Sequence, residues 1–359
     1  NSIGLLYSAF TYYIGFKVNS GEYKLMGLAP YGKPIYSRII KESLIDIKAD
    51  GSFRLNQKYF NYSTGFKMTN NNFNKLFGEK PRSPETKIKK FHMDIAASIQ
   101  KVTEEIVIKI LQSIRHEYKI DNLCLAGGVA LNCVANGKIR DMQIFKNLWI
   151  QPAAGDAGGS IGAALSFWHM HLKKNRQRKV KDEMQGSYLG PFFKGSEIKK
   201  SLIKASANFE ICKKEEIVKK TAREIAKGKA VAWFQGRMEF GPRSLGSRSI
   251  LADPRNKKMQ KNLNLKVKFR ESFRPFAPSI IEEKTSQWFD LNEKSPYMLL
   301  VSNVKQNKLK KINKKSEDKL SSINEVRSVI PAVTHIDNSA RIQTVDKKTN
   351  KIFYELIYE

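Results

Sequence analysis

The chain has 359 residues, of which 41% are hydrophobic and 10% aromatic, a composition typical of a folded protein long enough for two domains. Its 64 Lys and Arg residues outnumber 34 Asp and Glu residues, which gives a formal net charge of +30. The sequence contains no apolar run of the roughly 20 residues that a membrane-spanning helix needs, so we exclude a membrane protein. Its three cysteines show no CxxC spacing and favour reduced thiols and a cytoplasmic location.

The positive charge lies mostly in dispersed lysine-rich runs at residues 173–181, 194–200 and 305–319. Such runs are typical of solvated loops and linkers. They lack the interleaved aromatic residues that stack on bases, and no zinc-finger, homeodomain or RNP pattern is present. The charge therefore favours anionic small molecules over nucleic acid as partners, and homo-oligomerisation stays open.

The first 172 residues predict an α/β domain. Residues 25–28 suggest a short helical turn or a strand end. A longer helix runs from Asp94 to about His116 with one apolar stripe: Ile95, Ile99, Val102, Ile106 and Ile110. Residues 121–126 read as a buried strand, followed by a Gly-Gly turn and a helix over 129–139. Residues 147–151, 152–159 and 160–171 repeat the order of strand, glycine-rich loop and helix. This order predicts a ligand at the carboxyl ends of the strands.

A basic linker over residues 173–189 precedes a second α/β domain at 190–359. In that domain, residues 215–227 form an amphipathic helix and residues 230–234 a strand that leads into the segment Gly236–Asn256. Residues 330–345 alternate apolar and polar side chains well enough to form paired strands.

Two glycine-rich turns in the first domain are candidate ligand sites. Gly127, Gly128 and Asn132 follow the first strand, where backbone amides suit a phosphate and the Asn side chain suits a ribose or phosphate oxygen. Asp156 and Gly158 lie in the loop after the second strand. Asp156 fits either a divalent-metal ligand or an ordinary helix N-cap, and a glycine turn before a helix also occurs for structural reasons alone.

The segment Gly236–Asn256 (GRMEFGPRSLGSRSILADPRN) combines three glycines, four arginines and core-anchoring residues such as Glu239 and Leu245. Arginine forks suit small oxyanions such as phosphate. The candidate residues for such a pocket, here and downstream, are Arg243, Arg248, Lys268, Arg270, Arg274, His335 and Arg341. His335 suits a proton shuttle or a phosphate donor. A basic surface loop and a structural histidine are the competing interpretations.

Six motifs in order resemble those of the NodU/CmcH-type O-carbamoyltransferases: KLMGLAPYGKP, LAGGVALN, QPAAGDAGGSIGAA, EFGPRSLGSRSILADPR, FRESFRPFAPSI and PAVTHIDNSARIQTV. The resemblance implies a first domain similar to the C-terminal part of the actin/sugar-kinase-like (ASKHA) fold and a second similar to the YrdC fold. It also implies carbamoyl-adenylate formation from carbamoyl phosphate and ATP, and transfer of the carbamoyl group to a hydroxyl of a sugar, glycan or antibiotic-like acceptor.

By the same resemblance, Asp156 is the expected ligand of a divalent metal, either iron or magnesium. Gly127, Gly128 and Asn132 are expected to contact nucleotide in the first domain. The glycine-rich composition of the second loop adds Gly158, which would let a nucleotide approach the backbone. Lys268, Arg270, Arg274 and Arg341 are expected to bind carbamoyl phosphate and ATP in the second, with Arg243, Arg248 and His335 as catalytic candidates. We expect the chain to be truncated at both ends, with a histidine pair of the metal site before its start. A tRNA threonylcarbamoyladenosine-type enzyme and a non-catalytic nucleotide-binding remnant are the alternatives.

Overall fold

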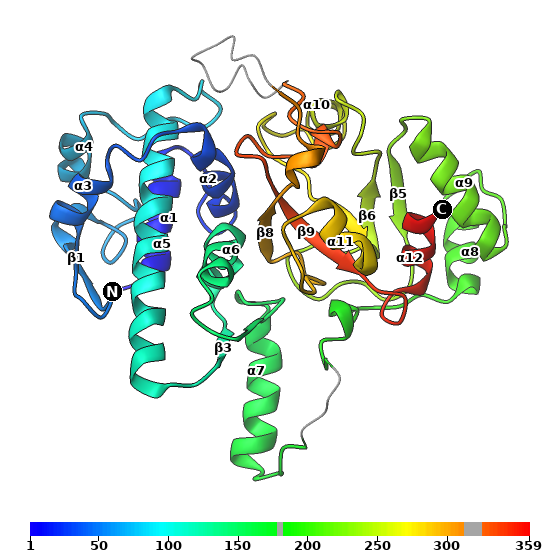
Figure 1. Ribbon diagram of the computed structural model, residues 1–359, viewed down its shortest axis with the longest axis horizontal. Helices are drawn as coiled ribbons and strands as arrows, with labels where there is room; N and C mark the ends of the chain where they lie inside the picture. The colour runs from blue at the N-terminus through cyan, green and yellow to red at the C-terminus, as the bar shows by residue number, and fades with distance from the viewer. Residues whose placement is uncertain (178–181, 312–324) are drawn as a thin grey trace. The chain divides into compact units, whose positions relative to one another are not determined.

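The computed structural model describes residues 1–177, 182–311 and 325–359 (Figure 1). The predicted linker 173–189 and the lysine-rich run 305–319 therefore lie partly outside the described residues. The chain divides into two compact units. Of the described residues, unit 1 comprises Asn1–Trp149, Phe269–Pro275 and Glu325, and unit 2 comprises 150–177, 182–268, Phe276–Lys311 and Val326–Glu359. Contacts between residues separate the two units at Ile150. The sequence predicts other bounds, with domains over residues 1–172 and 190–359, and these bounds stay a prediction.

Unit 1 is built around one long helix, α5 (Lys90–Tyr118), which lies beside α1 (Ile3–Tyr13) and α2 (Glu22–Leu28) (Figure 1). The predicted stripe is confirmed, because Ile95, Ile99, Val102 and Ile106 are fully buried, while Ile110 is half-buried. Burial of each such side chain contributes about 1.5–3 kcal/mol. The helix begins with a hydrogen bond from the backbone N–H of Lys89 to Nδ1 of His92 (2.9 Å) and ends at Lys119, whose φ is 53°.

The remaining elements of unit 1 are short: α3 (Ser37–Ile39), α4 (Asn71–Phe77), α6 (Cys133–Asp141), β1 (Ile45–Ile47), β2 (Phe53–Leu55) and β3 (Asn122–Leu125). Strands β1 and β2 pair antiparallel, and β3 pairs with β4 (Asn147–Ile150). An aromatic cluster joins α1 to α4, with Phe10 and Tyr13 edge-on to Phe73 at centroid distances of 5.2 and 4.8 Å. Aromatic packing thus fixes α4 on the helical core.

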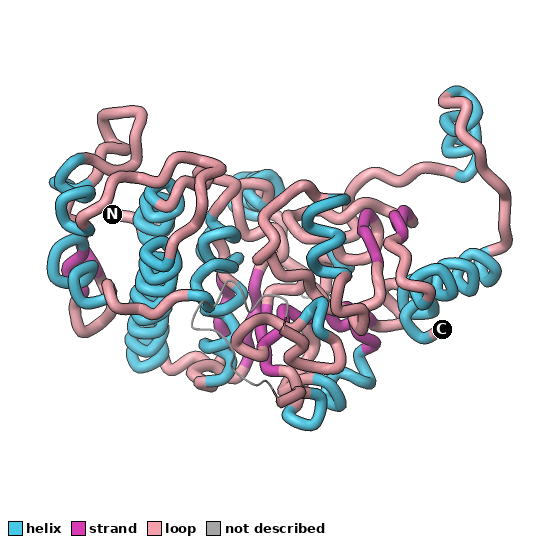
Figure 2. The backbone as a smooth tube through the Cα atoms, turned by 90° about the horizontal axis from the view of Figure 1, so that it is seen from above, coloured by secondary structure: helices cyan, strands magenta, loops and turns pink. Residues whose placement is uncertain are grey.

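Helices and loops make up most of the chain, and the strands are short (Figure 2). Unit 2 contains β5 (Val231–Phe234), β6 (Arg248–Leu251), β7 (Ser279–Ile281), β8 (Leu300–Asn303) and β9 (Ser339–Val345). Its helices are α7 (Gly158–Ser166), α8 (Gly195–Lys204), α9 (Lys214–Ala226), α10 (Met259–Asn262), α11 (Thr285–Trp288) and α12 (Lys351–Tyr358). The mixture of helices and strands agrees with the predicted α/β class.

Two small sheets organise unit 2. Strands β5 and β6 pair antiparallel, and β9 lies between β7, to which it is parallel, and β8, to which it is antiparallel. The predicted strand pair over 330–345 is only half correct. Residues 339–345 form β9, whereas Pro331–Val333 form a single 3-10 turn, since Pro331 has no N–H to donate to a sheet.

A hydrophobic cluster of unit 2 joins α9, β5 and α12 through Val218, Trp233, Phe353 and Leu356. In the described ranges, no helix is both long and apolar enough to span a membrane.

Candidate functional site

The predicted site residues fall into both units. Unit 1 contains Gly127, Gly128, Asn132, Arg270 and Arg274. Unit 2 contains Asp156, Gly158, Arg243, Arg248, Lys268, His335 and Arg341. Each group is described by itself.

In unit 1, the Gly127–Gly128 turn is exposed and connects β3 to a short 3-10 helix, Gly128–Leu131. Gly127 has a φ of 96°, which favours glycine, and a Cβ at either position would have no heavy atom within 4 Å. The space beside these two residues would therefore admit a ligand close to the backbone. The helix predicted over 129–139 is interrupted at Asn132, whose ψ of 86° ends the 3-10 helix before α6 begins.

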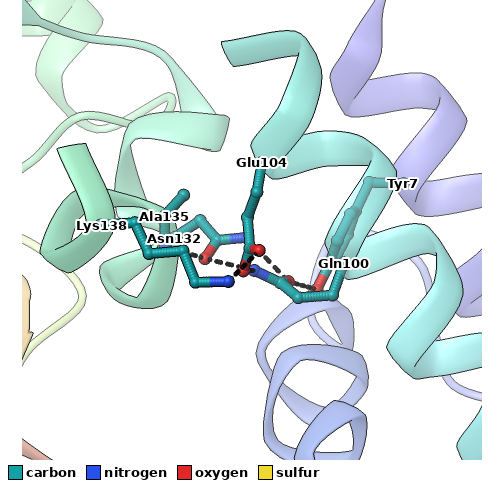
Figure 3. Close-up of polar contacts among 6 residues, drawn as sticks. All are labelled: Tyr7, Gln100, Glu104, Asn132, Ala135 and Lys138. Atoms are coloured by element: carbon teal, nitrogen blue, oxygen red, sulfur yellow. Dashed lines mark hydrogen bonds and ion pairs between the residues drawn. The ribbon is translucent and has the colours of Figure 1, made fainter. Parts of the chain in front are cut away.

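Asn132 is 8% exposed and belongs to a buried polar network (Figure 3). Its Oδ1 accepts hydrogen bonds from the N–H of Ala135 (3.1 Å) and from Gln100 Nε2 (3.2 Å), and its Nδ2 donates to Gln100 Oε1 (3.0 Å). These contacts make Asn132 the N-cap of α6 and attach the turn to α5. Contact of its side chain with a nucleotide stays a prediction.

The network continues from α5 to α1 and α6 (Figure 3). Tyr7 donates to Gln100 Oε1 (2.8 Å), and Gln100 Nε2 also donates to Glu104 Oε1 (2.8 Å). Glu104 is 5% exposed and forms an ion pair with Lys138, which balances the buried charge. Burial and the carboxylate of Glu104 raise the pKa of Tyr7 well above its usual value, so this hydroxyl stays a hydrogen-bond donor.

Arg270 and Arg274 lie in a segment that packs within unit 1, Phe269–Pro275. Phe273 is 4% exposed and lies next to Phe16 and Tyr31, at ring-centroid distances of 6.4 and 6.2 Å. Glu271 forms an ion pair with Lys24 (2.6 Å), and the guanidinium of Arg274 lies 4.4 Å from the ring centroid of Tyr23. These two arginines thus lie in a different unit from Arg243, and their predicted binding of carbamoyl phosphate and ATP stays a prediction.

In unit 2, Gly236–Ser247 is the loop between the antiparallel strands β5 and β6. Glu239 is 7% exposed, and its Oε1 accepts hydrogen bonds from the backbone N–H groups of Leu245 (2.8 Å), Ser247 (2.8 Å) and Arg248 (3.2 Å). Hydrogen bonds to a charged acceptor contribute about 1.5–3 kcal/mol each. The predicted anchoring role of Glu239 and Leu245 is thus explained by a carboxylate that binds the backbone of its own loop.

The carbonyl of Leu245 is held as well. It accepts hydrogen bonds from Gln343 Nε2 (2.8 Å) and from the hydroxyl of Tyr188 (2.7 Å). Gln343 lies on β9 two residues from Arg341, so both side chains project from the same face of that strand. The loop therefore lies beside the strand that carries Arg341, whose half-buried guanidinium makes no hydrogen bond or ion pair with the residues that the structure describes.

The side chain of Arg248 contacts residues at the two ends of its own loop. Its guanidinium lies 3.5 Å from the ring centroid of Phe234 and donates to the carbonyls of Gln235 (2.8 Å), Ser247 (3.0 Å) and Gly236 (3.2 Å). A guanidinium that already binds three carbonyls holds the ends of the loop together. Its predicted catalytic role is untested and stays a prediction.

His335 lies at the start of the turn that leads into β9. The hydroxyl of Ser339 donates to Asp337 (2.6 Å), so its oxygen accepts from Nδ1 of His335 (3.3 Å). This network assigns the proton of the ring to Nδ1 and leaves Nε2 as a buried acceptor with no partner among the described residues. Burial and the nearby charge of Arg341 lower the pKa of His335 and outweigh the opposing effect of Asp337. A neutral acceptor suits this geometry better than the predicted phosphate donor.

Asp156 is exposed in the loop between β4 and α7. A Cβ on Gly158 would lie 2.2 Å from the carbonyl oxygen of Ala153, so this glycine is required for the close packing of the loop itself. The same loop approaches the Gly236–Ser247 loop, because a Cβ on Gly241 would lie 3.2 Å from the carbonyl oxygen of Pro152. Over residues 1–177, 182–311 and 325–359, no group of three or more His, Cys, Asp and Glu residues could hold a metal.

The sequence patterns do not indicate Tyr188 and assign no role to Gln343. Gln343 lies 98 residues from Leu245 along the chain, and Tyr188 lies 57 residues away. No local pattern connects residues so distant, although the glutamine stands within one of the six ordered motifs.

Comparison with known proteins identifies the family. The model of the carbamoyltransferase N-terminus matches residues 1–165, and that of the carbamoyltransferase C-terminus matches residues 222–359. An uncharacterised protein of Synechocystis is 55% identical over 99% of this chain and 59% of its own length. The nodulation protein NolNO of Sinorhizobium fredii is 35% identical (99% and 48%), and the nodulation protein NolO of Bradyrhizobium diazoefficiens is 34% identical (99% and 60%).

The chain thus spans between 48% and 60% of the length of these three curated relatives. Both family models match in the predicted order, and together they include both loops described above. This chain belongs to the carbamoyltransferase family.

Proposed function

We propose that the protein is an ATP-dependent O-carbamoyltransferase, in which unit 2 activates the carbamoyl group and the acceptor is a hydroxyl of a sugar, glycan or antibiotic-like molecule. The observation that carries the proposal is the loop Gly236–Ser247, whose base is fixed by Glu239 and Gln343 beside the strand of Arg341. A rigid loop with an arginine at its tip suits the recognition of phosphate groups. In this proposal, unit 1 resembles part of an ASKHA domain and unit 2 a YrdC-like domain.

The proposed activation must balance. Carbamoyl phosphate, ATP and one water give carbamoyl-adenylate, phosphate and pyrophosphate. Water cleaves the bond between the carbamoyl group and its original phosphate to give phosphate and carbamate, and a carbamate oxygen then displaces pyrophosphate from the α-phosphorus of ATP. The acceptor hydroxyl then attacks the carbamoyl carbon, loses its proton, and AMP departs.

Named residues support these steps. Arg243 and Arg341 would neutralise phosphate charge, and the neutral Nε2 of His335 would accept a hydrogen bond rather than donate one. The exposed backbone of Gly127 and Gly128 would admit a nucleotide in unit 1. Asp156 is a single carboxylate without further ligands nearby in the described chain, so it fits a complete metal site poorly and we derive no step through a metal.

The test is the Arg243→Ala variant of the complete natural protein. We expect it to abolish AMP formation that depends on carbamoyl phosphate. The matched control is Arg255→Ala, which removes an arginine of the same segment whose charge is already paired with Asp253 (2.8 Å). Unchanged AMP formation in Arg243→Ala would contradict the assignment of this pocket. Absence of both pyrophosphate release and AMP formation in the unsubstituted protein would instead favour a non-catalytic nucleotide-binding remnant.

A further inference from the structure

The carboxylate of Glu239 is buried among backbone N–H groups. It precedes the loop tip, Gly241–Ser244, whereas its three donors, Leu245, Ser247 and Arg248, follow that tip. In the described part of the chain it forms no ion pair, so these N–H dipoles are its main compensation for burial. A carboxylate buried without a cation needs several such donors. Glu239 therefore closes the loop at its base.

A second set of hydrogen bonds supports the same base. Gln235 Nε2 donates to the carbonyl of Gly246 (2.9 Å) and to Asn350 Oδ1 (3.0 Å), and Asn350 Nδ2 donates to Tyr188 (2.9 Å). Gln343 is oriented by the hydroxyl of Ser279, which donates to its Oε1 (2.7 Å). The backbone from Leu245 onward is thus held by side chains from several elements of unit 2.

The tip of the loop differs from its base. Gly241, Pro242 and Ser244 are exposed and Arg243 is half-buried, whereas Leu245 and Ser247 are only 2% and 1% exposed. The four residues of the tip are connected to the rest of the loop at Phe240 and at Leu245. The hydrogen bonds of Glu239 hold these two points close together, so the position of the tip depends on them. Loss of this closure would let the tip sample many conformations.

We infer that Glu239 is a positioning residue that holds the tip of the loop, with Arg243, in the geometry for binding carbamoyl phosphate and ATP. This inference rests on the proposed function. Glu239 contacts no substrate in this scheme and acts through the loop. It would pre-organise the pocket, so that little conformational freedom is lost when the phosphate groups bind.

The test compares three variants of the complete natural protein. Glu239→Ala removes the acceptor, and Glu239→Gln keeps its shape and one neutral acceptor oxygen. Val218→Ala is the stability control, because it makes a cavity in the hydrophobic cluster of α9, β5 and α12 without touching the hydrogen bonds of Glu239. Two quantities are measured at a temperature where all variants are folded: pyrophosphate release as a function of carbamoyl phosphate concentration, and amide hydrogen exchange of residues 239–251.

We expect Glu239→Ala to raise the KM for carbamoyl phosphate at least tenfold and to accelerate amide exchange at Leu245 and Ser247 at least tenfold. Glu239→Gln should lie between Glu239→Ala and the unsubstituted protein, and Val218→Ala should change neither quantity. Faster exchange with unchanged KM and kcat would show a purely structural residue and overturn the inference. Unchanged exchange would overturn it as well, since the hydrogen bonds would then not hold the loop.

The two proposals fail in distinguishable ways. If the unsubstituted protein releases no pyrophosphate, the proposed function fails together with the substrate part of this inference. The exchange measurement would still decide whether Glu239 holds the loop tip, because it requires no activity.

Discussion

Among the glycines of the loop between β5 and β6, Gly246 has the least space for a side chain. Its φ is 99°, and a Cβ there would lie 2.3 and 2.5 Å from ring atoms of Phe353, which is 2% exposed on α12. An alanine at this position adds backbone strain of about 1–3 kcal/mol and a steric conflict of about 1–3 kcal/mol. We therefore expect Gly246→Ala to reduce the free energy of unfolding by about 4 kcal/mol.

The matched control is Gly236→Ala in the same loop. Gly236 also has a positive φ, 56°, but a Cβ there would have no heavy atom within 4 Å, so the expected loss is only about 1 kcal/mol. Urea unfolding followed by the fluorescence of Trp233, which lies in the cluster of Phe353, measures both losses. Adding Phe353→Leu to Gly246→Ala should recover part of the stability. Equal losses for the two alanine variants would refute the steric argument.

Two further predictions concern unit 1. Burial, with a smaller effect of Arg82, lowers the pKa of His92 from 6.5 to about 4, so the unfolded chain binds the proton first as the pH falls. Stability should decrease by about 1–2 kcal/mol between pH 7 and pH 5, and His92→Gln, which keeps an acceptor for Lys89, should flatten that dependence in urea unfolding at both pH values. Phe273→Ala should release the segment Phe269–Pro275 and accelerate tryptic cleavage after Arg270, whereas equal cleavage rates in variant and parent would contradict the packing of this segment on unit 1.

The parts of the fold that could be predicted are those with local causes. The stripe of α5 follows from a spacing of three and four residues, and the Gly127–Gly128 turn follows from two adjacent glycines after a strand. The break at Asn132 was not predicted, because it depends on Gln100, which lies 32 residues away and satisfies both polar groups of the asparagine side chain. The packing of Phe269–Pro275 within unit 1 likewise depends on residues far apart in the chain, because Lys24 and Glu271 are 247 residues apart.

The candidate site shows a similar limit. The sequence predicts that the arginines of the Gly236–Asn256 segment share a role, because they have the same side chain. In the structure, however, Arg248 and Arg255 have different partners. The guanidinium of Arg248 binds three carbonyls at the ends of the loop, and that of Arg255 binds Asp253. The number of arginines in the segment is therefore larger than the number whose positive charge could be directed at a ligand.

The loop is instead held by hydrogen bonds between its charged side chains and its own backbone groups. Its buried carboxylate, Glu239, accepts hydrogen bonds from backbone N–H groups, while its half-buried guanidinium, Arg248, donates to backbone carbonyls. Each charge thereby provides partners for backbone groups of the loop, as buried backbone polar groups require. A loop built in this way can be rigid without regular secondary structure. Rigidity at the base and exposure at the tip are two properties that suit the proposed binding of phosphate groups, and different residues of this loop supply them.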